Sequence, residues 1–356
     1  MSLLKIIPLG GLGEIGLNMM VFEYGDTIFL VDSGLMFPED YMLGVDFVIP
    51  NMDYLRQNQS KLAAVVLTHA HEDHIGALPY LIKDIKVPVF GTPFTLGLVR
   101  HKLEELELIH STALHEISLD ENLRLGPFDI EFIRVGHSVV DGVGLVIHTP
   151  CGTLVHTGDY KIGYGAVGGM TTDLNKFAGC GEKGVLALLS DSTNVEKEGY
   201  TISDKEIGET LDKIIADSRG RIIVALFASN VARTQLIVDI ARARGKKIVI
   251  SGRSIEVSVN IAKALGHLTI PAEMEIDIEQ VPDFADDDII MITTGSQGEP
   301  MSALARSELR TMFMPKWTEN TISTYTIAMN SRRRPMNRSM ATSILPPAQT
   351  AALREP

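Results

Sequence analysis

The chain has 356 residues, of which 45% are hydrophobic and 22% are charged, and its formal net charge is −13. This length accommodates two domains with sizeable cores. The acidic balance argues against a broad basic surface that grips nucleic acid nonspecifically, although a local basic groove or a metal site could still meet phosphate. No stretch approaches the roughly 18 consecutive apolar residues of a membrane span, so we expect no membrane partner.

The cysteine content and the N-terminal segment bear on the cellular compartment. The two cysteines, Cys151 and Cys180, do not make a disulfide framework. Residues 1–7 lead directly into a Gly-rich turn, without the basic region and the cleavage site of a signal peptide. We therefore expect a cytoplasmic protein.

The first 202 residues alternate short apolar strands with turn signals and helices. The spacing predicts strands at 5–9, 27–32, 63–68, 87–90, 130–135, 144–149 and 153–156. Helices are predicted at about 76–83 and 94–108. A β-rich pattern with interposed helices is typical of a layered α/β domain.

A second domain is predicted from residue 203. Ser203 and Glu206 have the spacing of a capping box, and apolar residues follow at helical intervals. Strands are then predicted at 221–227, 247–251 and 288–293, and helices at 234–243 and 255–265. The alternation of strands and helices is expected for a parallel sheet.

The last segment, 306–356, lacks periodicity and predicts neither helix nor strand. It is rich in Thr, Met and Asn, contains the only tryptophan, Trp317, and carries the arginine run 332–334. We interpret it as an aberrant, disordered tail, with the arginines solvated rather than bound to phosphate.

The stretch 69–74, His-Ala-His-Glu-Asp-His, follows the buried strand pattern at 62–67. His69, His71, Asp73 and His74 therefore lie on one short loop. Imidazole and carboxylate together suit zinc or a similar borderline cation, and they can serve two adjacent ions. A solvated polar loop is the alternative, but the chain has only ten histidines, and three at this spacing favour a metal site.

Three further polar residues follow other predicted strands: Asp32, His137 and Asp159. Taken singly, each could be a turn residue or a structural histidine. Asp159 could bridge two ions, and Asp32 could orient a ligand imidazole from behind. All of them lie where a strand meets a loop, and folds built on sheets often place catalytic and binding residues at such positions. Together they therefore favour one shared site.

The order Asp, His-x-His-x-Asp-His, His and Asp resembles the metallo-β-lactamase superfamily. Within it, several segments are similar to ribonuclease J, and the resemblance covers about residues 5–306. These segments are 10–16, 31–38, 71–80, 157–161, 190–194, 227–230 and 294–300. The resemblance implies an α/β fold: a metallo-β-lactamase αββα sandwich, incomplete, at 1–202, with an inserted β-CASP parallel α/β domain, partial, at 203–305.

The resemblance also implies a site with two zinc ions, manganese being the alternative metal. His69, His71 and His137 would hold one ion. Asp73, His74 and a bridging Asp159 would hold the other.

Further roles carry over from the family by position. Asp191 matches an acidic motif that supports the metal site, so that Asp32, Asp73, Asp159 and Asp191 form the implied catalytic set. Ser229 and Asn230 fall where the family helps to grip RNA phosphate. Gly44 and Asp46 fall where some members bind a structural calcium.

The implied function is a zinc-dependent ribonuclease with 5′–3′ exonuclease and endonuclease activity in rRNA processing and mRNA decay. Its substrate would be 5′-monophosphorylated single-stranded RNA, and the protein would be a homo-oligomer, a dimer or tetramer. Two alternatives remain open. One is another hydrolase of the same fold that acts on thioesters or lactams, and the other is a non-catalytic partner of a full-length ribonuclease.

Two later family motifs, His-Val-Ser-Gly-His and Pro-Val-His-Gly-Glu, do not occur, and the last histidine is His267. We therefore expect a truncation or frameshift after about residue 306, with 311–317 as an out-of-frame translation. Reading the coding DNA in all frames tests this hypothesis. Lost ligands and strands predict weak metal binding and poor degradation of RNA.

Overall fold

The computed structural model describes residues 2–38, 41–163, 171–199, 203–294, 325–330 and 352–354. The chain divides into two compact units, with the division between Glu198 and Gly199, next to the predicted boundary at 202/203. Most of the predicted tail and most of the segment 294–300 lie outside the described residues, as do 311–317 and the arginine run 332–334.

The first unit contains a mixed sheet of six strands in the order β1-β2-β3-β4-β5-β6. β1 to β3 pair antiparallel, whereas β3 to β6 pair parallel. The strands are β1 (Leu4–Gly10), β2 (Met19–Tyr24), β3 (Thr27–Val31), β4 (Leu62–Val66), β5 (Val89–Gly91) and β6 (Leu114–Glu116). The parallel pairs matter for the site because they bring the carboxyl ends of β3 and β4 to one edge.

A second sheet of the same unit has the order β11-β10-β9-β8-β7, antiparallel except for the parallel pair β10–β11. Its strands are β7 (Leu123–Leu125), β8 (Phe128–Arg134), β9 (Val143–Thr149), β10 (Gly152–His156) and β11 (Ala187–Leu189). Phe22 and Phe29 from the first sheet share one buried cluster with Phe128 and Phe132 from the second. The two sheets therefore pack face to face, and burial of this apolar area holds them together.

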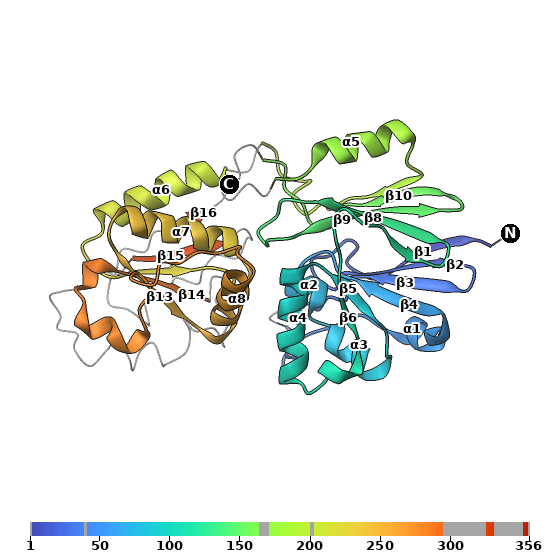
Figure 1. Cartoon of the computed structure of the whole chain (residues 1–356), viewed down its shortest axis with the longest axis horizontal. Helices are drawn as coiled ribbons and strands as arrows, with labels where there is room; N and C mark the ends of the chain where they lie inside the picture. The colour runs from blue at the N-terminus through green and yellow to red at the C-terminus, as the bar shows by residue number, and fades with distance from the viewer. Residues whose placement is uncertain are drawn as a thin grey trace. The chain divides into compact units, whose positions relative to one another are not determined.

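Helices cover the outer faces of both sheets (Figure 1). The first sheet is covered by α1 (Asp53–Gln57), α2 (Glu72–Ile75), α3 (Leu78–Asp84), α4 (Pro93–Glu105) and the 3₁₀ turns Gln59–Lys61 and Ile109–Ser111. The second is covered by α5 (Leu174–Lys183), whose Phe177 and Cys180 pack against Val146 and Val155. These four layers confirm the predicted αββα sandwich.

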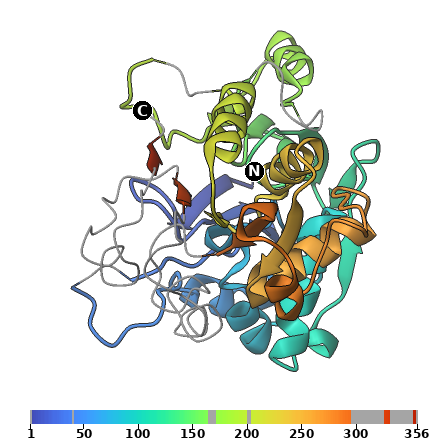
Figure 2. The same cartoon turned by 90° about the vertical axis from the view of Figure 1, so that its left-hand side faces the viewer.

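The second unit is built on a parallel sheet in the order β13-β14-β12-β15-β16. Its helices α6 and α7 lie side by side (Figures 1 and 2). The elements are α6 (Asp204–Asp217), β12 (Ile222–Ala225), α7 (Val231–Ala243), β13 (Lys247–Ser251), α8 (Arg253–Ala264), the 3₁₀ segments Ile278–Asp283 and Asp286–Asp288, β14 (Ile289–Thr293), β15 (Tyr325–Asn330) and β16 (Ala352–Arg354). The parallel α/β architecture expected for this region is confirmed.

Two strands differ from the sequence prediction. β15 and β16 fall within 306–356, where no regular element was expected. β15 pairs with β12, the strand that otherwise would be an edge, and the aromatic and β-branched residues of its Tyr-Thr-Ile run favour a strand. The prediction of a segment without strands is therefore wrong for these residues. Among the described helices, none is long and apolar enough to cross a membrane.

Candidate metal centre

The polar residues singled out in the first unit are brought to one edge of the sandwich. Asp32 directly follows β3, and the loop from Thr68 to His74 follows β4. His137 follows β8 and Asp159 follows β10. Backbone hydrogen bonds hold these loops: Asp32 N–H donates to Val66 O at 3.0 Å, Val143 N–H donates to Thr68 O at 3.0 Å, and Lys161 N–H donates to Gly136 O at 2.7 Å between the loops after β10 and β8.

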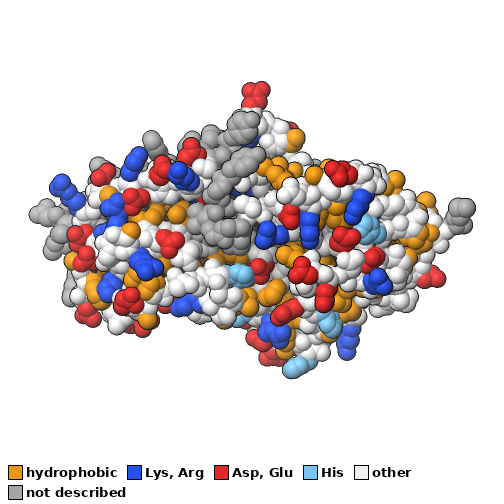
Figure 3. Space-filling view, turned by 45° about the horizontal axis from the view of Figure 1, so that its top comes forward, with side chains coloured by type: hydrophobic (Ala, Val, Ile, Leu, Met, Phe, Trp, Pro, Cys, Tyr) orange, Lys and Arg blue, Asp and Glu red, His pale blue; other side chains and the backbone are white. Residues whose placement is uncertain are grey.

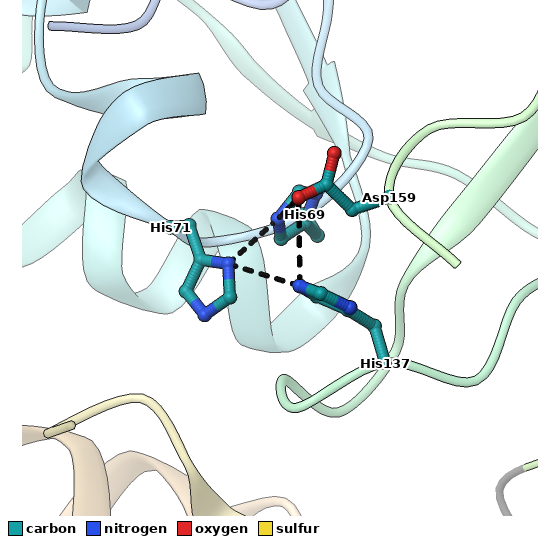
Figure 4. Close-up of side chains that lie close together, drawn as sticks. All are labelled: His69, His71, His137 and Asp159. Carbon is teal, nitrogen blue, oxygen red and sulfur yellow. Dashed lines mark hydrogen bonds and ion pairs between the residues drawn. The ribbon is translucent and has the colours of Figure 1, made fainter. Parts of the chain in front are cut away.

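Four of these side chains, from three loops, point toward one another (Figure 4). One donor atom from each of His69, His71, His137 and Asp159 lies within 4.8 Å of all the others. His71 Nδ1 is 2.9 Å from His69 Nε2 and 3.2 Å from His137 Nε2. Asp159 Oδ2 is 3.9 Å from His69 Nε2 and 3.6 Å from His137 Nε2. Three nitrogens and one oxygen at these separations fit a tetrahedral ion with bonds of about 2.0–2.2 Å.

A second group of donors begins at the other oxygen of Asp159. Its Oδ1 lies 3.4 Å from His74 Nε2, and Asp73 Oδ2 lies 4.0 Å from the same nitrogen. Asp159 therefore faces both groups with different oxygens, which is the arrangement that a bridging carboxylate requires.

Asp32 lies behind this second group rather than in it. Residue Asp32 is buried, with 2% of its surface exposed, and its Oδ2 lies 2.7 Å from His74 Nδ1. Thr68 donates to the same carboxylate from its backbone N–H and from its hydroxyl, each at 2.8 Å. Because Nδ1 is engaged by Asp32, the ring presents Nε2 to Asp159, as expected for a residue that orients a ligand.

Two hydroxyl groups that the sequence analysis did not single out contact His69 and His71. Thr68 Oγ1 lies 3.0 Å from His69 Nδ1, and Ser138 Oγ lies 3.1 Å from His71 Nε2. Each therefore engages the ring nitrogen that faces away from the donor group. Their position next to a histidine in the sequence, Thr68 before His69 and Ser138 after His137, is the signal that could have found them.

The loop after β3 and the His-rich loop are pressed together backbone to backbone. Ser33 N–H donates to His74 O at 2.7 Å. A Cβ on Gly34 would lie 1.6 Å from Asp73 O, well inside any allowed contact. Residue 34 must therefore be glycine, because any side chain would push Asp73 and His74 away from Asp159.

Burial and charge set the protonation of the site in opposite directions. Burial lowers the pKa of His69 and His137, and it lowers that of His71 to about 3, so these three rings are neutral and carry free lone pairs. For His74, burial opposes the charge, but Asp159 and Asp32 outweigh it and raise the pKa. The Asp159 pKa is lowered because His74 outweighs its burial. A cation that binds His74 must therefore displace a proton.

Asp191 follows β11 and stands beside the donor groups. Its backbone N–H donates to Thr157 Oγ1 at 3.0 Å, and its Oδ1 accepts from Thr193 N–H at 2.8 Å. The charge of Asp191 opposes the lowering of the His137 pKa by burial. This placement is compatible with the supporting role that the resemblance implies.

The other candidate residues lie elsewhere. Asp46 is exposed and joins no group of three or more potential metal ligands among the described residues, and its calcium role, with Gly44, stays a prediction. In the second unit, Ser229 and Asn230 lie between β12 and α7, where Asn230 Oδ1 accepts from Arg233 N–H at 3.1 Å and caps the helix. A phosphate contact by these two residues also stays a prediction.

Two family models match the chain. The model of the metallo-beta-lactamase superfamily matches residues 12–164, the region that holds the histidine cluster. The model of the ribonuclease J beta-CASP domain matches residues 219–341 and extends past residue 306. Fold and site thus define a member of the metallo-β-lactamase superfamily.

Curated relatives narrow the assignment. Ribonuclease J of Helicobacter pylori strain 26695 is 43% identical over 303 residues, which are 85% of this chain and 44% of that protein. Ribonuclease J of Thermus thermophilus is 45% identical over 309 residues, 85% of this chain and 54% of that protein. The chain belongs to the ribonuclease J family, and it spans about half the length of these relatives.

A solved structure supports the fold alone. A protein of unknown function from Enterococcus faecalis V583 matches with a TM-score of 0.67 at 13% identity. The match covers 100% of this chain and 88% of that chain. The architecture of both units therefore occurs in an experimentally determined structure.

Proposed function

We propose that the chain is a metal-dependent ribonuclease that hydrolyses RNA phosphodiester bonds with two zinc ions, or with manganese in their place. The observation that carries the proposal is the pair of donor groups that share Asp159, one oxygen toward each group. When bound, two such ions supply positive charge to the scissile phosphate and activate water for attack on phosphorus.

We assign each residue of the site a role in holding the ions or in positioning a ligand. His69, His71 and His137 offer neutral nitrogens to the first ion, which needs no proton to leave them. Asp73 and His74 would hold the second ion, and Asp159 would contribute an oxygen to each position. Asp32 fixes the ring of His74 by its hydrogen bond to Nδ1, and Asp191 adds negative charge beside His137.

The substrate follows from the family and from the charge of the surface. The relatives are named ribonuclease J, which supports RNA as the substrate. On the face drawn in Figure 3, Lys and Arg side chains are interspersed with Asp and Glu, and the net charge is −13. Such a surface favours phosphate recognition at local contacts, for which we propose Ser229 and Asn230.

The finer functional assignments complete the proposal. We propose 5′–3′ exonuclease and endonuclease action on 5′-monophosphorylated single strands, in rRNA processing and mRNA decay in the cytoplasm. We also propose assembly as a dimer or tetramer, which light scattering measures.

The test is RNA cleavage by the full chain loaded with zinc or manganese. We expect 5′-monophosphorylated RNA to be shortened slowly from its 5′ end, because two later family motifs do not occur in the sequence, in a metal-dependent reaction that Asp159→Asn abolishes. A thioester and a chromogenic β-lactam serve as control substrates. Metal-loaded protein that cleaves either control but no RNA would contradict the proposal.

A further inference from the structure

We propose that the side chain of Asn18 is a further ligand of the second ion, through its carboxamide oxygen. The starting observation is that Asn18 Nδ2 lies 3.1 Å from His74 Nε2, the nitrogen that faces Asp159 and Asp73. The inference rests on the proposed two-ion centre and adds a residue to it.

The distances around His74 Nε2 place the amide among the ligands of the second ion. Asp159 Oδ1 lies 3.4 Å from this nitrogen and Asp73 Oδ2 lies 4.0 Å from it. Donors bound at about 2.1 Å to one tetrahedral ion lie roughly 3.4 Å apart. Asn18 Nδ2, whose place the oxygen takes when the carboxamide turns by half a turn, lies at 3.1 Å and is nearer to that separation than the Asp73 oxygen is. An ion on His74 Nε2 therefore reaches Asn18 at least as readily as Asp73.

The backbone holds Asn18 in this place. Its N–H donates to Asp73 O at 3.1 Å, and its C=O accepts from Gly34 N–H at 2.9 Å. Asn18 is thus tied to the His-rich loop on one side and to the turn after β3 on the other. A ligand held this way loses little conformational entropy when an ion binds.

The Gly-rich turn before β2 leaves room for the side chain. A Cβ on Gly11 would lie 2.7 Å from Asn18 Oδ1, the amide atom turned away from His74, and Gly11 has a φ of +83°. Gly11 N–H donates to Glu14 Oε1 at 3.2 Å, which secures the turn. The space that holds the Asn18 amide therefore exists only because residue 11 has no side chain.

The charge of an ion selects which end of the amide faces it. Rotation of the carboxamide by half a turn exchanges its NH₂ group and its oxygen with little change in shape. A cation on His74 Nε2 repels the NH₂ group and attracts the oxygen. Binding of the second ion therefore turns the oxygen of Asn18 toward His74.

This assignment makes the two positions chemically unlike. The first position has three nitrogens and one oxygen, from His69, His71, His137 and Asp159. The second has one nitrogen, from His74, and oxygens from Asp73, Asp159 and Asn18. Because carboxylate and carbonyl oxygens suit manganese, whereas imidazole suits zinc, we expect zinc to fill the first position preferentially and manganese to be accepted at the second.

The test is a metal titration that involves no RNA. Metal-free full chain receives one equivalent of zinc and is then titrated with Mn²⁺, while the electron paramagnetic resonance signal of free Mn²⁺ reports binding. Asn18→Ala should weaken Mn²⁺ binding about tenfold or more, the size of effect seen when a metal-site partner is removed. Asn18→Asp, which keeps an oxygen in place, should bind Mn²⁺ at least as tightly as the parent chain. Asn122→Ala, at an exposed asparagine, should match the parent chain.

Retention of the first zinc by Asn18→Ala shows that the surrounding loops are folded, so its Mn²⁺ affinity is then decisive. A parent-like affinity in that variant overturns the inference. If Asn18→Ala loses zinc as well, Asn18→Asp decides: retained Mn²⁺ binding supports the ligand and lost binding overturns it. A parent chain that binds no Mn²⁺ beside zinc overturns both the ligand and the second position. Failure to cleave RNA with both metals bound overturns only the nuclease proposal.

Discussion

Both units carry polar residues on the loops at the ends of their strands, but the chemical types of these residues differ between the units. In the first unit the loops after β3, β4, β8 and β10 bring charged and imidazole side chains together in a partly buried group. In the second unit the described residues of the loops after β12, β13 and β14 include Ser229, Asn230, Gly252 and Thr294, which are uncharged. Among the described residues of that unit, no cluster of metal-binding side chains occurs.

The difference lies in what supports the loops. In the first unit the polar side chains bond to one another, as Asp32 does to His74 and Thr68. In the second unit they serve the backbone, as when Asn230 caps α7. Strand ends therefore become a reactive centre only where a network of side chains compensates the burial of charge. Substitutions in each unit and a change of pH test this contrast.

The largest effect is expected for Gly34→Ala in the first unit. The new Cβ would overlap Asp73 O, and that carbonyl cannot retreat without breaking the contact of the two loops. We expect a loss of at least about 5 kcal/mol in the free energy of unfolding and no bound zinc. Urea denaturation and elemental analysis measure both quantities.

Gly179→Ala in α5 is the matched control, because nothing lies within 4 Å of a Cβ there. That change should stabilise the helix by roughly 0.5–1 kcal/mol. Equal effects of the two substitutions would mean that the contact between the loops does not matter.

Asp32→Ala removes the buried carboxylate behind His74. The loss leaves His74 Nδ1 and both donors of Thr68 without their acceptor. Breaking a buried pair in this way costs about 3–5 kcal/mol, and the second ion should bind more weakly. Asp53→Ala, at a side chain 62% exposed, should change stability by less than about 0.5 kcal/mol. A stable Asp32→Ala variant with normal metal content would refute the supporting role.

A smaller effect is expected from pH on the metal-free chain. His69, His71 and His137 have pKa values below the 6.5 of an unfolded chain, that of His71 being about 3. As pH falls below 6.5 the unfolded state takes up these protons first, so stability must fall from there toward the folded pKa values. His74 has a raised pKa, and its contribution is already complete below pH 6.5. Urea denaturation at about pH 7 and about pH 5 should show the loss, and zinc should oppose it; equal stability at both pH values would contradict the assignment.

The smallest effect belongs to the second unit. Asn230→Ala removes the cap of α7 and should cost about 1 kcal/mol, with zinc content unchanged. Asn230→Asp keeps an oxygen for Arg233 N–H and should be nearly neutral. A change in zinc content with Asn230→Ala would contradict the claim that only the loops of the first unit determine metal binding.

Much of this arrangement could be predicted from the sequence, because the buried strand before His69 and the loops that carry Asp32, His137 and Asp159 have local signals. Several elements were not predicted, among them β2 and α5. β2 begins with four apolar residues, Met19–Phe22, that do not alternate with polar ones, and α5 contains Gly179 and Gly181, which weaken helix propensity; packing of Phe177 against the sheet stabilises α5. Asn18 was missed for a different reason: its contact with His74 spans 56 residues. Spacing within a segment cannot reveal such contacts.

Anomalous diffraction at the zinc edge, from crystals of the zinc-loaded chain, measures whether the first unit holds two ions around Asp159. We predict two anomalous peaks, one bound by His69, His71 and His137 and the other by Asp73 and His74, with a different oxygen of Asp159 on each. A single peak, or peaks away from Asp159, would contradict the account.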